Sequence, residues 1–201
     1  MVVVEPRVEL LSSSRDPLET IAMSAKLTHS ENINFNIGYE EAEKMVKKMI
    51  ELGHESTLEH ASFTFLVICS RVCSHQLVRH RIGVSYSQRS ERYVEFDDLG
   101  VIIPPDIAEN KDFRESYMDH MRRSHELYEG LRARGIKKED ARFILPRVAT
   151  KIMVSFNARS LRHFLKLRMD QSAQWEIRSI ANQLAELVPE ILVEDIRSEN
   201  I

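Results

Sequence analysis

An apolar stretch of nine residues, SFTFLVICS (Ser62–Ser70), predicts a strand at the centre of the fold. It is rich in aromatic and β-branched side chains, which favour strands. Apolar residues occupy both of its alternating faces, as in strands that are covered on both sides. Cys69 of this stretch and Cys73 beyond it are the only cysteines, so a disulfide scaffold is excluded. We therefore expect a buried strand, with both thiols acting as small apolar groups of the core.

Helix and strand patterns lie on both sides of this strand. Further strands are expected over Val8–Leu11 and Lys151–Phe156. Tyr39–Leu52 has the spacing of an amphipathic helix, and Gly53 is placed to end it. The remaining expected elements are helices at 17–25, 71–81, 111–132, 138–143, 158–167 and 172–187, and an extended or looped segment at 84–96. The predicted fold class is α/β, in the mixed α+β sense: a single domain over residues 1–201, with a central sheet flanked by long helices.

Composition excludes several classes of protein. Hydrophobic residues make up 43% of the chain and charged residues 29%, as in soluble globular proteins. The net charge of −3 gives no general attraction to nucleic acid. The longest uncharged apolar stretch, Phe63–Cys69, is far shorter than the roughly 20 residues that span a bilayer. The N-terminus lacks the basic and apolar parts of a secretory signal. We therefore expect a cytoplasmic protein that binds neither nucleic acid nor membrane.

The spacing of the glycines excludes the common phosphate-binding loops. The closest two of the six glycines are five residues apart, and neither GxGxxG nor the P-loop motif is present. The chain also has no CxxC and no HExxH, so we expect no metal site. A phosphate-bearing ligand would therefore be held by arginines, hydroxyl groups and helix N-termini.

Basic residues concentrate between Arg71 and Arg92. Five arginines and two histidines lie in this stretch, and Glu91 is its only acidic residue. In a helix, Gln76, Arg79 and His80 would share one face, next to a loop rich in serine and tyrosine. Guanidinium groups beside hydroxyls are suited to phosphate binding, but a solvated basic helix gives the same pattern. These residues alone leave both interpretations open.

Two further polar clusters have structural alternatives as well. The segment GHESTLEH (Gly53–His60) joins a helix to the buried strand, and a histidine in such a loop is more often structural than catalytic. In the second cluster Asn157 is suited to cap a helix, and Arg168 to interact with a helix dipole at the C-terminal end. The members of that cluster are Asn157, Arg159, Arg162, His163 and Arg168.

Three blocks of sequence, in this order, resemble the signature of the flavin-dependent thymidylate synthases. They are Gly53–Ser56 with Glu59–His60, then Arg79–Arg81 with Ser90–Tyr93, then Asn157–Leu161 with Leu167–Arg168 and Ala173–Ile177. The middle block resembles the family's RHR motif, but eight residues rather than seven separate it from the serine. The blocks cover most of residues 50–180, and the chain is identified as a member of this family.

The resemblance implies a homotetramer with FAD bound where subunits meet, and the reductive methylation of dUMP to dTMP. Methylenetetrahydrofolate would supply the carbon, NADPH would reduce the flavin, and no enzyme nucleophile would attack the base. Because the cofactor supplies the difficult chemistry, the protein's part is binding and electrostatics. As catalytic residues, Arg168 would bind and polarise the uracil, and His54 would lie beside the flavin ring.

The same resemblance assigns the binding residues by motif position. Those expected to contact FAD are Ser56, Arg79, His80, Arg81, Gln88, Asn157, Arg159 and His163. Those expected around dUMP are Gln76, Arg79, Gln88, Arg89, Ser90, Glu91, Arg92, Arg142 and Arg168. Gln88 and His163 stand where the family often has Glu and Asn.

Two other functions stay open. One is a flavoprotein that acts on another pyrimidine nucleotide, for example by transferring a hydroxymethyl group. The other is a module that binds single-stranded RNA through residues 71–92. The net negative charge and the lack of a clear row of aromatic side chains argue against RNA binding.

Overall fold

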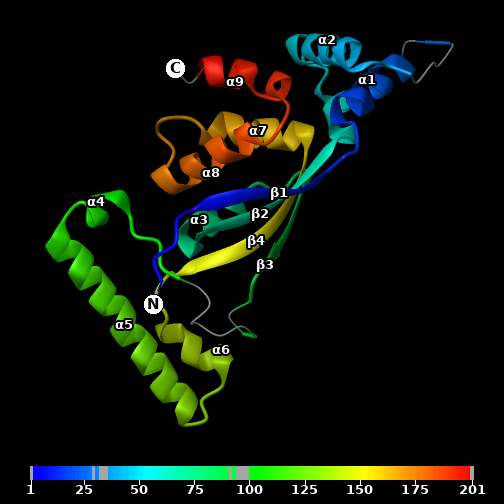
Figure 1. Ribbon diagram of the computed structural model, residues 1–201. Coiled ribbons are helices and arrows are strands. Elements are labelled where there is room, and N and C mark those ends of the chain that lie inside the picture. The colour runs from blue at the N-terminus through cyan, green and yellow to red at the C-terminus, as the bar shows by residue number, and fades with distance from the viewer. Residues whose placement is uncertain (1, 29, 32–35, 91, 94–99, 200–201) are drawn as a thin grey trace. The chain divides into compact units, whose positions relative to one another are not determined.

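The computed structural model describes residues 2–28, 30–31, 36–90, 92–93 and 100–199 (Figure 1). A four-stranded sheet has the strand order β1-β2-β4-β3. The strands are β1 (Arg7–Ser13), β2 (Ser62–Ser70), β3 (Val84–Gln88) and β4 (Ala149–Asn157). Neighbouring strands run antiparallel, since the backbone pairs Ser14 with Ser62, Arg71 with Val148, and Gly83 with Asn157. The predicted mixed fold with a central sheet is confirmed.

Each helix that the sequence predicts is present, with ends shifted by a few residues. The helices are α1 (Pro17–Leu27), α2 (Tyr39–Glu51), α3 (Arg71–Leu77), α4 (Pro105–Ala108), α5 (Lys111–Ala133), α6 (Lys138–Ala141), α7 (Ala158–Arg168), α8 (Trp175–Glu186) and α9 (Glu194–Glu199). Short 3-10 helices cover Glu55–His60, Arg142–Ile144 and Glu190–Leu192. Within the described residues, no helix is long and apolar enough to cross a membrane.

The chain divides into two compact units, each made of several segments. The first unit comprises residues 1–6, 68–75 and 88–152, and the second comprises residues 7–67, 76–87 and 153–201. In the first unit α5 packs against α4 and α6, over a core that includes Tyr128, Ala141 and Val148. In the second unit α1 packs on α2, and α7 on α8, which also contacts β1 (Figure 1).

Strand β2 is buried on both faces only in its second half. Phe63 and Phe65 are buried, whereas Thr64 and Leu66 between them are half-exposed. From Val67 to Ser70 every residue is buried. The prediction of a strand covered on both sides is therefore right for this half only. Cys69 and Cys73 are free thiols with no exposed surface, so their predicted place in the core is confirmed.

Helix α3 ends four residues before the predicted end at Arg81. The hydroxyl of Tyr86 lies 2.8 Å from the carbonyl oxygen of Leu77 and 2.7 Å from that of His80, and donates to this pair. If the helix continued, these carbonyls would instead accept hydrogen bonds from backbone amides four residues later. The extended segment predicted at 84–96 forms β3 over Val84–Gln88, and its last three residues lie outside the described ranges.

Candidate active site

The end of α2 fixes the position of His54. Gly53 has a φ of +70°, and its amide donates to Ile50 O at 3.0 Å while the amide of His54 donates to Met49 O at 2.8 Å. These paired bonds are typical of helices that end in a left-handed glycine, as predicted for Gly53. The carbonyl of His54 accepts a bond from the hydroxyl of Thr57 at 3.0 Å. The backbone of His54 is thus held on both sides of the turn.

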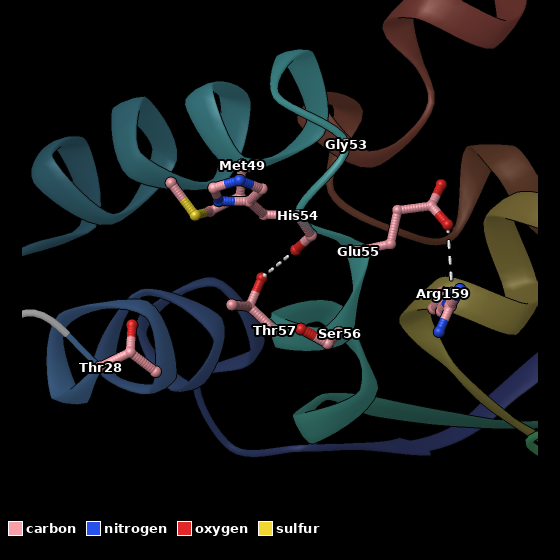
Figure 2. A pocket seen from close by; sticks show the side chains of 8 residues that line it. All are labelled: Thr28, Met49, Gly53, His54, Glu55, Ser56, Thr57 and Arg159. Carbon is pink, nitrogen blue, oxygen red and sulfur yellow. Dashed lines mark hydrogen bonds and ion pairs between the residues drawn. The ribbon is translucent and has the colours of Figure 1, made fainter.

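An open cavity of about 370 Å³ lies at this turn (Figure 2). It brings together three residues predicted for the site: His54, Ser56 and Arg159. Nε of Arg159 donates to Glu55 at 3.2 Å, the contact drawn in Figure 2, and Nη1 donates to Glu59 at 2.6 Å. The hydrogen bond with Glu59, with the charges of both carboxylates, raises the pKa of Arg159. A larger hollow of about 720 Å³ along α5 contains none of the predicted site residues.

The RHR segment follows α3 and reaches α7 through its histidine. Arg79 and Arg81 are exposed, while His80 is half-buried. The imidazole of His80 packs edge-on against Phe164, with ring centroids 4.8 Å apart, and lies 6.2 Å from the ring of His163. Nε of Arg168 donates to Nε2 of His80 at 3.1 Å. The structure thus joins His80, His163 and Arg168, which are far apart in the sequence.

His80 is uncharged in this environment. Burial of the ring, followed by the charges of Arg168 and His163, lowers the pKa of His80 from 6.5 to about 4. A neutral imidazole has one nitrogen with a lone pair, and the contact with Arg168 identifies this nitrogen as Nε2. His80 therefore serves as the hydrogen-bond acceptor.

The start of α7 holds the loop that follows the RHR segment. The side chain of Asn157 accepts a bond from the Ser160 amide at 2.8 Å, which confirms the predicted N-cap. The backbone amide of Asn157 donates to Gly83 O at 3.0 Å, and the Ser160 hydroxyl donates to Ile82 O at 2.6 Å. Asn157 therefore has the structural role that the sequence left open, and together with Ser160 it fixes residues 82–83.

The residues expected around dUMP fall in both units. Gln76, Arg79 and Arg168 belong to the second unit, where Gln76 donates to Gln174 at 3.5 Å. The first unit contains Gln88, Arg89, Ser90, Arg92 and Arg142. Glu91 lies outside the described residues.

In the first unit, Glu139 links two of the expected substrate arginines. Nη2 of Arg92 donates to its carboxylate at 3.1 Å, and Nε of Arg142 donates to its backbone carbonyl at 3.2 Å. The amide nitrogen of Gln88 lies within 3.3 Å of the hydroxyls of Ser74 and Thr150, both of which are buried. These polar contacts hold Arg92, Arg142 and Gln88 within the first unit.

Arg162 is a structural residue rather than a member of the site. Its guanidinium donates to both carboxylate oxygens of Asp195, at 2.9 and 2.7 Å, and to Leu192 O at 2.6 Å. Its side chain is 11% exposed. The hydrogen bond from Arg162 lowers the pKa of Asp195. The polar cluster of residues 157–168 therefore separates into residues that face the site and one that holds α9 to α7.

Sequence reasoning missed three residues that support the site: Tyr86, Glu139 and Gln174. Gln174 lies in a block with a family resemblance, and its Oε1 also accepts bonds from the first amides of α8, at 3.1 and 3.3 Å. No helix or strand periodicity identifies the contacts of Tyr86 with Leu77 and His80, or the contact of Glu139 with Arg92, which is 47 residues away. Within the described ranges, no group of three or more His, Cys, Asp or Glu could hold a metal ion.

Known proteins resemble this chain over nearly its whole length. The family model described as "Thymidylate synthase complementing protein" matches residues 9–192. A flavin-dependent thymidylate synthase from Pyrococcus furiosus is 43% identical over 190 residues, which cover 90% of this chain and 78% of that protein. One from Geobacter sulfurreducens is 40% identical, with 90% of this chain and 82% of that protein covered.

A solved structure has the same fold. It is a UMP/dUMP methylase, PolB, from Streptomyces cacaoi, bound with 5-Br dUMP. The TM-score is 0.84, and the match covers 98% of this chain and 97% of that one. At 24% identity, this likeness bears on the fold alone.

Proposed function

This chain belongs to the flavin-dependent thymidylate synthase family, and on that basis we propose that it converts dUMP to dTMP by reductive methylation. Methylenetetrahydrofolate is the proposed carbon donor and NADPH the proposed reductant of a bound FAD. The observation that carries the proposal is the contact of Arg168 with His80, since it joins two of the family blocks at one point. The relatives' names support the reaction, and the fold neighbour is described as a methylase of UMP and dUMP.

The residues around the cavity fit a flavin nucleotide. His54, Ser56 and Arg159 line it and supply an imidazole, a hydroxyl and a guanidinium. The exposed guanidinium groups of Arg79 and Arg81 add positive charge for the phosphates of FAD. The remaining proposed contacts are His80, Gln88, Asn157 and His163. When bound, FAD supplies the redox chemistry, and this chain's own residues bind and orient it.

The charge of Arg159 is balanced by Glu55 and Glu59 before any ligand binds. A phosphate at this arginine has to compete with two carboxylates. We propose that the two ion pairs keep the guanidinium of Arg159 oriented toward the cavity, because both carboxylates come from the 3-10 helix that forms the cavity wall. The two exposed ion pairs add little to stability by themselves.

We propose that dUMP is held by arginines, with Arg168 acting on the base. Gln76, Arg79, Gln88, Arg89, Ser90, Glu91, Arg92 and Arg142 are the other proposed contacts. Since Nε of Arg168 is used by His80, the donors proposed for uracil are those of its two terminal nitrogens. A guanidinium fixed against the ring stabilises the negative charge that hydride addition creates on the pyrimidine.

The absence of an enzyme nucleophile is supported by the state of both cysteines. A thiolate nucleophile needs an accessible, electropositive environment. Cys69 and Cys73 have no exposed surface and belong to the buried core. Two buried free thiols are also in keeping with the reducing cytoplasm, where we place the enzyme.

Assembly into a homotetramer is the remaining part of the proposal. In the second unit, Thr64 of β2 and Ser155 of β4 share a hydrogen bond of 2.9 Å, so their side chains lie on one face of the sheet. Met153, two residues before Ser155, lies on the same face and has 45% of its surface exposed. Apolar side chains on an uncovered sheet face are typical of surfaces that another subunit covers. We propose no nucleic-acid or membrane partner.

A product assay tests the proposed reaction. The flavin-loaded protein is reduced, mixed without oxygen with dUMP and methylenetetrahydrofolate, and analysed for dTMP. We expect dTMP from dUMP, and little product when UMP replaces dUMP. A product from UMP alone, or a hydroxymethylated nucleotide, would identify the other flavoprotein activity. A protein that takes up no flavin and binds single-stranded RNA in a salt-dependent manner would contradict the enzyme assignment.

A further inference from the structure

The hydrogen bond between Arg168 and His80 joins two segments 88 residues apart. Arg168 is the last residue of α7, where a long side chain has much conformational freedom. Its partner is held more firmly. The ring of His80 packs edge-on against Phe164, which is fully buried one turn earlier on the same helix. The imidazole thus lies between the core and the guanidinium.

The backbone of His80 is fixed as well. The amide of His80 donates to Leu77 O at 3.2 Å. The carbonyl of His80 accepts a bond from the hydroxyl of Tyr86, which also donates to Leu77 O. Tyr86 belongs to β3, so the turn that carries His80 is tied to the sheet. Burial raises the pKa of this phenol to about 12, which keeps the proton on the hydroxyl. Tyr86 thus holds the backbone of His80, and the imidazole of His80 in turn holds the guanidinium of Arg168.

The protonation state of His80 suits an acceptor. The charged and titratable groups that face its ring, Arg168 and His163, both come from α7, and with burial they keep the imidazole neutral. A protonated ring would present a second N–H to the Nε–H of Arg168, and the bond would be lost. At neutral pH the contact is therefore a stable, directional bond.

We propose that His80 is a positioning residue for Arg168: its Nε2 fixes the plane of the guanidinium that acts on the pyrimidine. This inference rests on the proposed function and gives His80 a role besides the flavin contact. A guanidinium is planar, so a bond at Nε together with the attachment at Cδ sets the direction of both terminal nitrogens. Misplacing a catalytic group by about 1 Å costs up to about a hundredfold in rate.

The matched variants His80→Gln and His80→Asn test this role. The amide oxygen of glutamine can take the place of Nε2, whereas the side chain of asparagine is too short for its amide oxygen to reach Arg168. With saturating dUMP and rates expressed per bound flavin, we expect His80→Asn to lower kcat by roughly ten- to a hundredfold. His80→Gln should recover most of this loss. The control is His120→Asn, an exposed position on α5 that should retain the parent rate.

A double-mutant cycle with Arg168→Lys separates positioning from flavin binding. Lysine has no Nε–H, so in this background His80→Asn should change kcat by less than about twofold. If the fold-losses in kcat caused by the two substitutions multiply, the imidazole does not act through Arg168. The same conclusion follows if His80→Asn causes an equal loss of flavin in the parent and in Arg168→Lys. Equal rates for the asparagine and glutamine variants would also overturn the proposal.

The same cycle, followed by thermal unfolding of the flavin-free protein, gives a readout that needs no activity. Partners in one hydrogen bond show non-additive losses in Tm, and we expect this for His80→Asn and Arg168→Lys. Additive losses would contradict the contact itself. A parent protein that makes no dTMP but shows the unfolding coupling would contradict only the proposed reaction. A parent that makes dTMP, with no coupling in either cycle, would contradict only the role of His80.

Discussion

Gly83 and Asn157 are packed so closely that no side chain fits at position 83. A Cβ added to Gly83 would overlap Ser160 Oγ and Asn157 Nδ2, and the carbonyl of Gly83 accepts a bond from the Asn157 amide at 3.0 Å. Gly83 also has a φ of +65°, which glycine adopts without strain. This contact lies between the RHR segment and β3, in the segment that is one residue longer than the family motif.

Gly83→Ala should therefore destabilise the protein strongly. The left-handed backbone alone costs a residue with a Cβ about 1 kcal/mol, and the overlap with α7 adds to this. We expect the free energy of unfolding to fall by about 2 kcal/mol or more, measured by urea denaturation. The control is Gly53→Ala, with a φ of +70° and no atom within 4 Å of the added Cβ. Equal losses for the two variants would show that the contact with α7 contributes nothing.

The depressed pKa of His80 predicts a loss of stability in acid. Its pKa is about 4 in the folded protein and 6.5 without the fold, so between these values the unfolded chain binds more protons. The contribution is complete above about pH 6.5 and is lost as the pH falls through about 4. We expect His80→Gln to flatten the curve of unfolding free energy against pH in this window. The difference should stay well below ~1.4 kcal/mol per pH unit, because solvent screens a half-exposed ring.

Protonation of carboxylates also lowers stability in acid, but it affects the parent and the variant alike. Parallel curves for the two proteins between about pH 4 and 6.5 would show that His80 does not titrate as its surroundings predict.

Asp195→Ala should show that Arg162 belongs to the fold. Arg162 is 11% exposed and bonds to both oxygens of Asp195, so the variant leaves a buried charge without its partner. We expect the free energy of unfolding to fall by about 3 kcal/mol. Glu190→Ala breaks the pair with Arg197, whose side chains are 38% and 60% exposed, and should cost less than about 1 kcal/mol. Equal costs in urea denaturation would contradict the structural role of Arg162.

Features that depend on near neighbours could be predicted from the sequence. Gly53 ends α2 because the bonds of a glycine-terminated helix lie within six residues, and Asn157 caps α7 because the amide that donates to its side chain is three residues away. The apolar stretch of β2 likewise carries its own signal. Motif positions then placed His54, Ser56 and Arg159, and these three do line one cavity.

Contacts between different elements left no such signal. Helix α3 was predicted four residues too long, and the carbonyl of its last residue, Leu77, accepts a bond from Tyr86 of β3, nine residues further on. Arg162 was grouped with a polar cluster and given no role, because its partner, Asp195, is 33 residues away. The bond between His80 and Arg168 spans 88 residues, so periodicity and composition could not find it.

The buried cysteines predict a reaction that needs neither thiol. Cys69→Ala/Cys73→Ala removes two groups with no exposed surface. We expect turnover per bound flavin to stay within about tenfold of the parent, or about 1.4 kcal/mol of barrier. Some loss of Tm is expected from the two small cavities. A folded, flavin-loaded double variant with no turnover would show that a cysteine takes part in the chemistry.

Arg168 should affect turnover rather than substrate binding. Hydride addition to uracil places negative charge on the ring, and a guanidinium fixed by His80 stabilises it more in the transition state than in the ground state. Arg168→Ala should therefore lower kcat by about a hundredfold with saturating dUMP. Arg92, whose exposed guanidinium pairs with Glu139, is expected to bind ligand equally in both states, so Arg92→Ala should mainly raise KM. Arg168→Lys should recover little, because an ammonium lacks the planar fork. Steady-state kinetics with flavin content measured in parallel would decide: if Arg168→Ala changes KM alone, its role is binding.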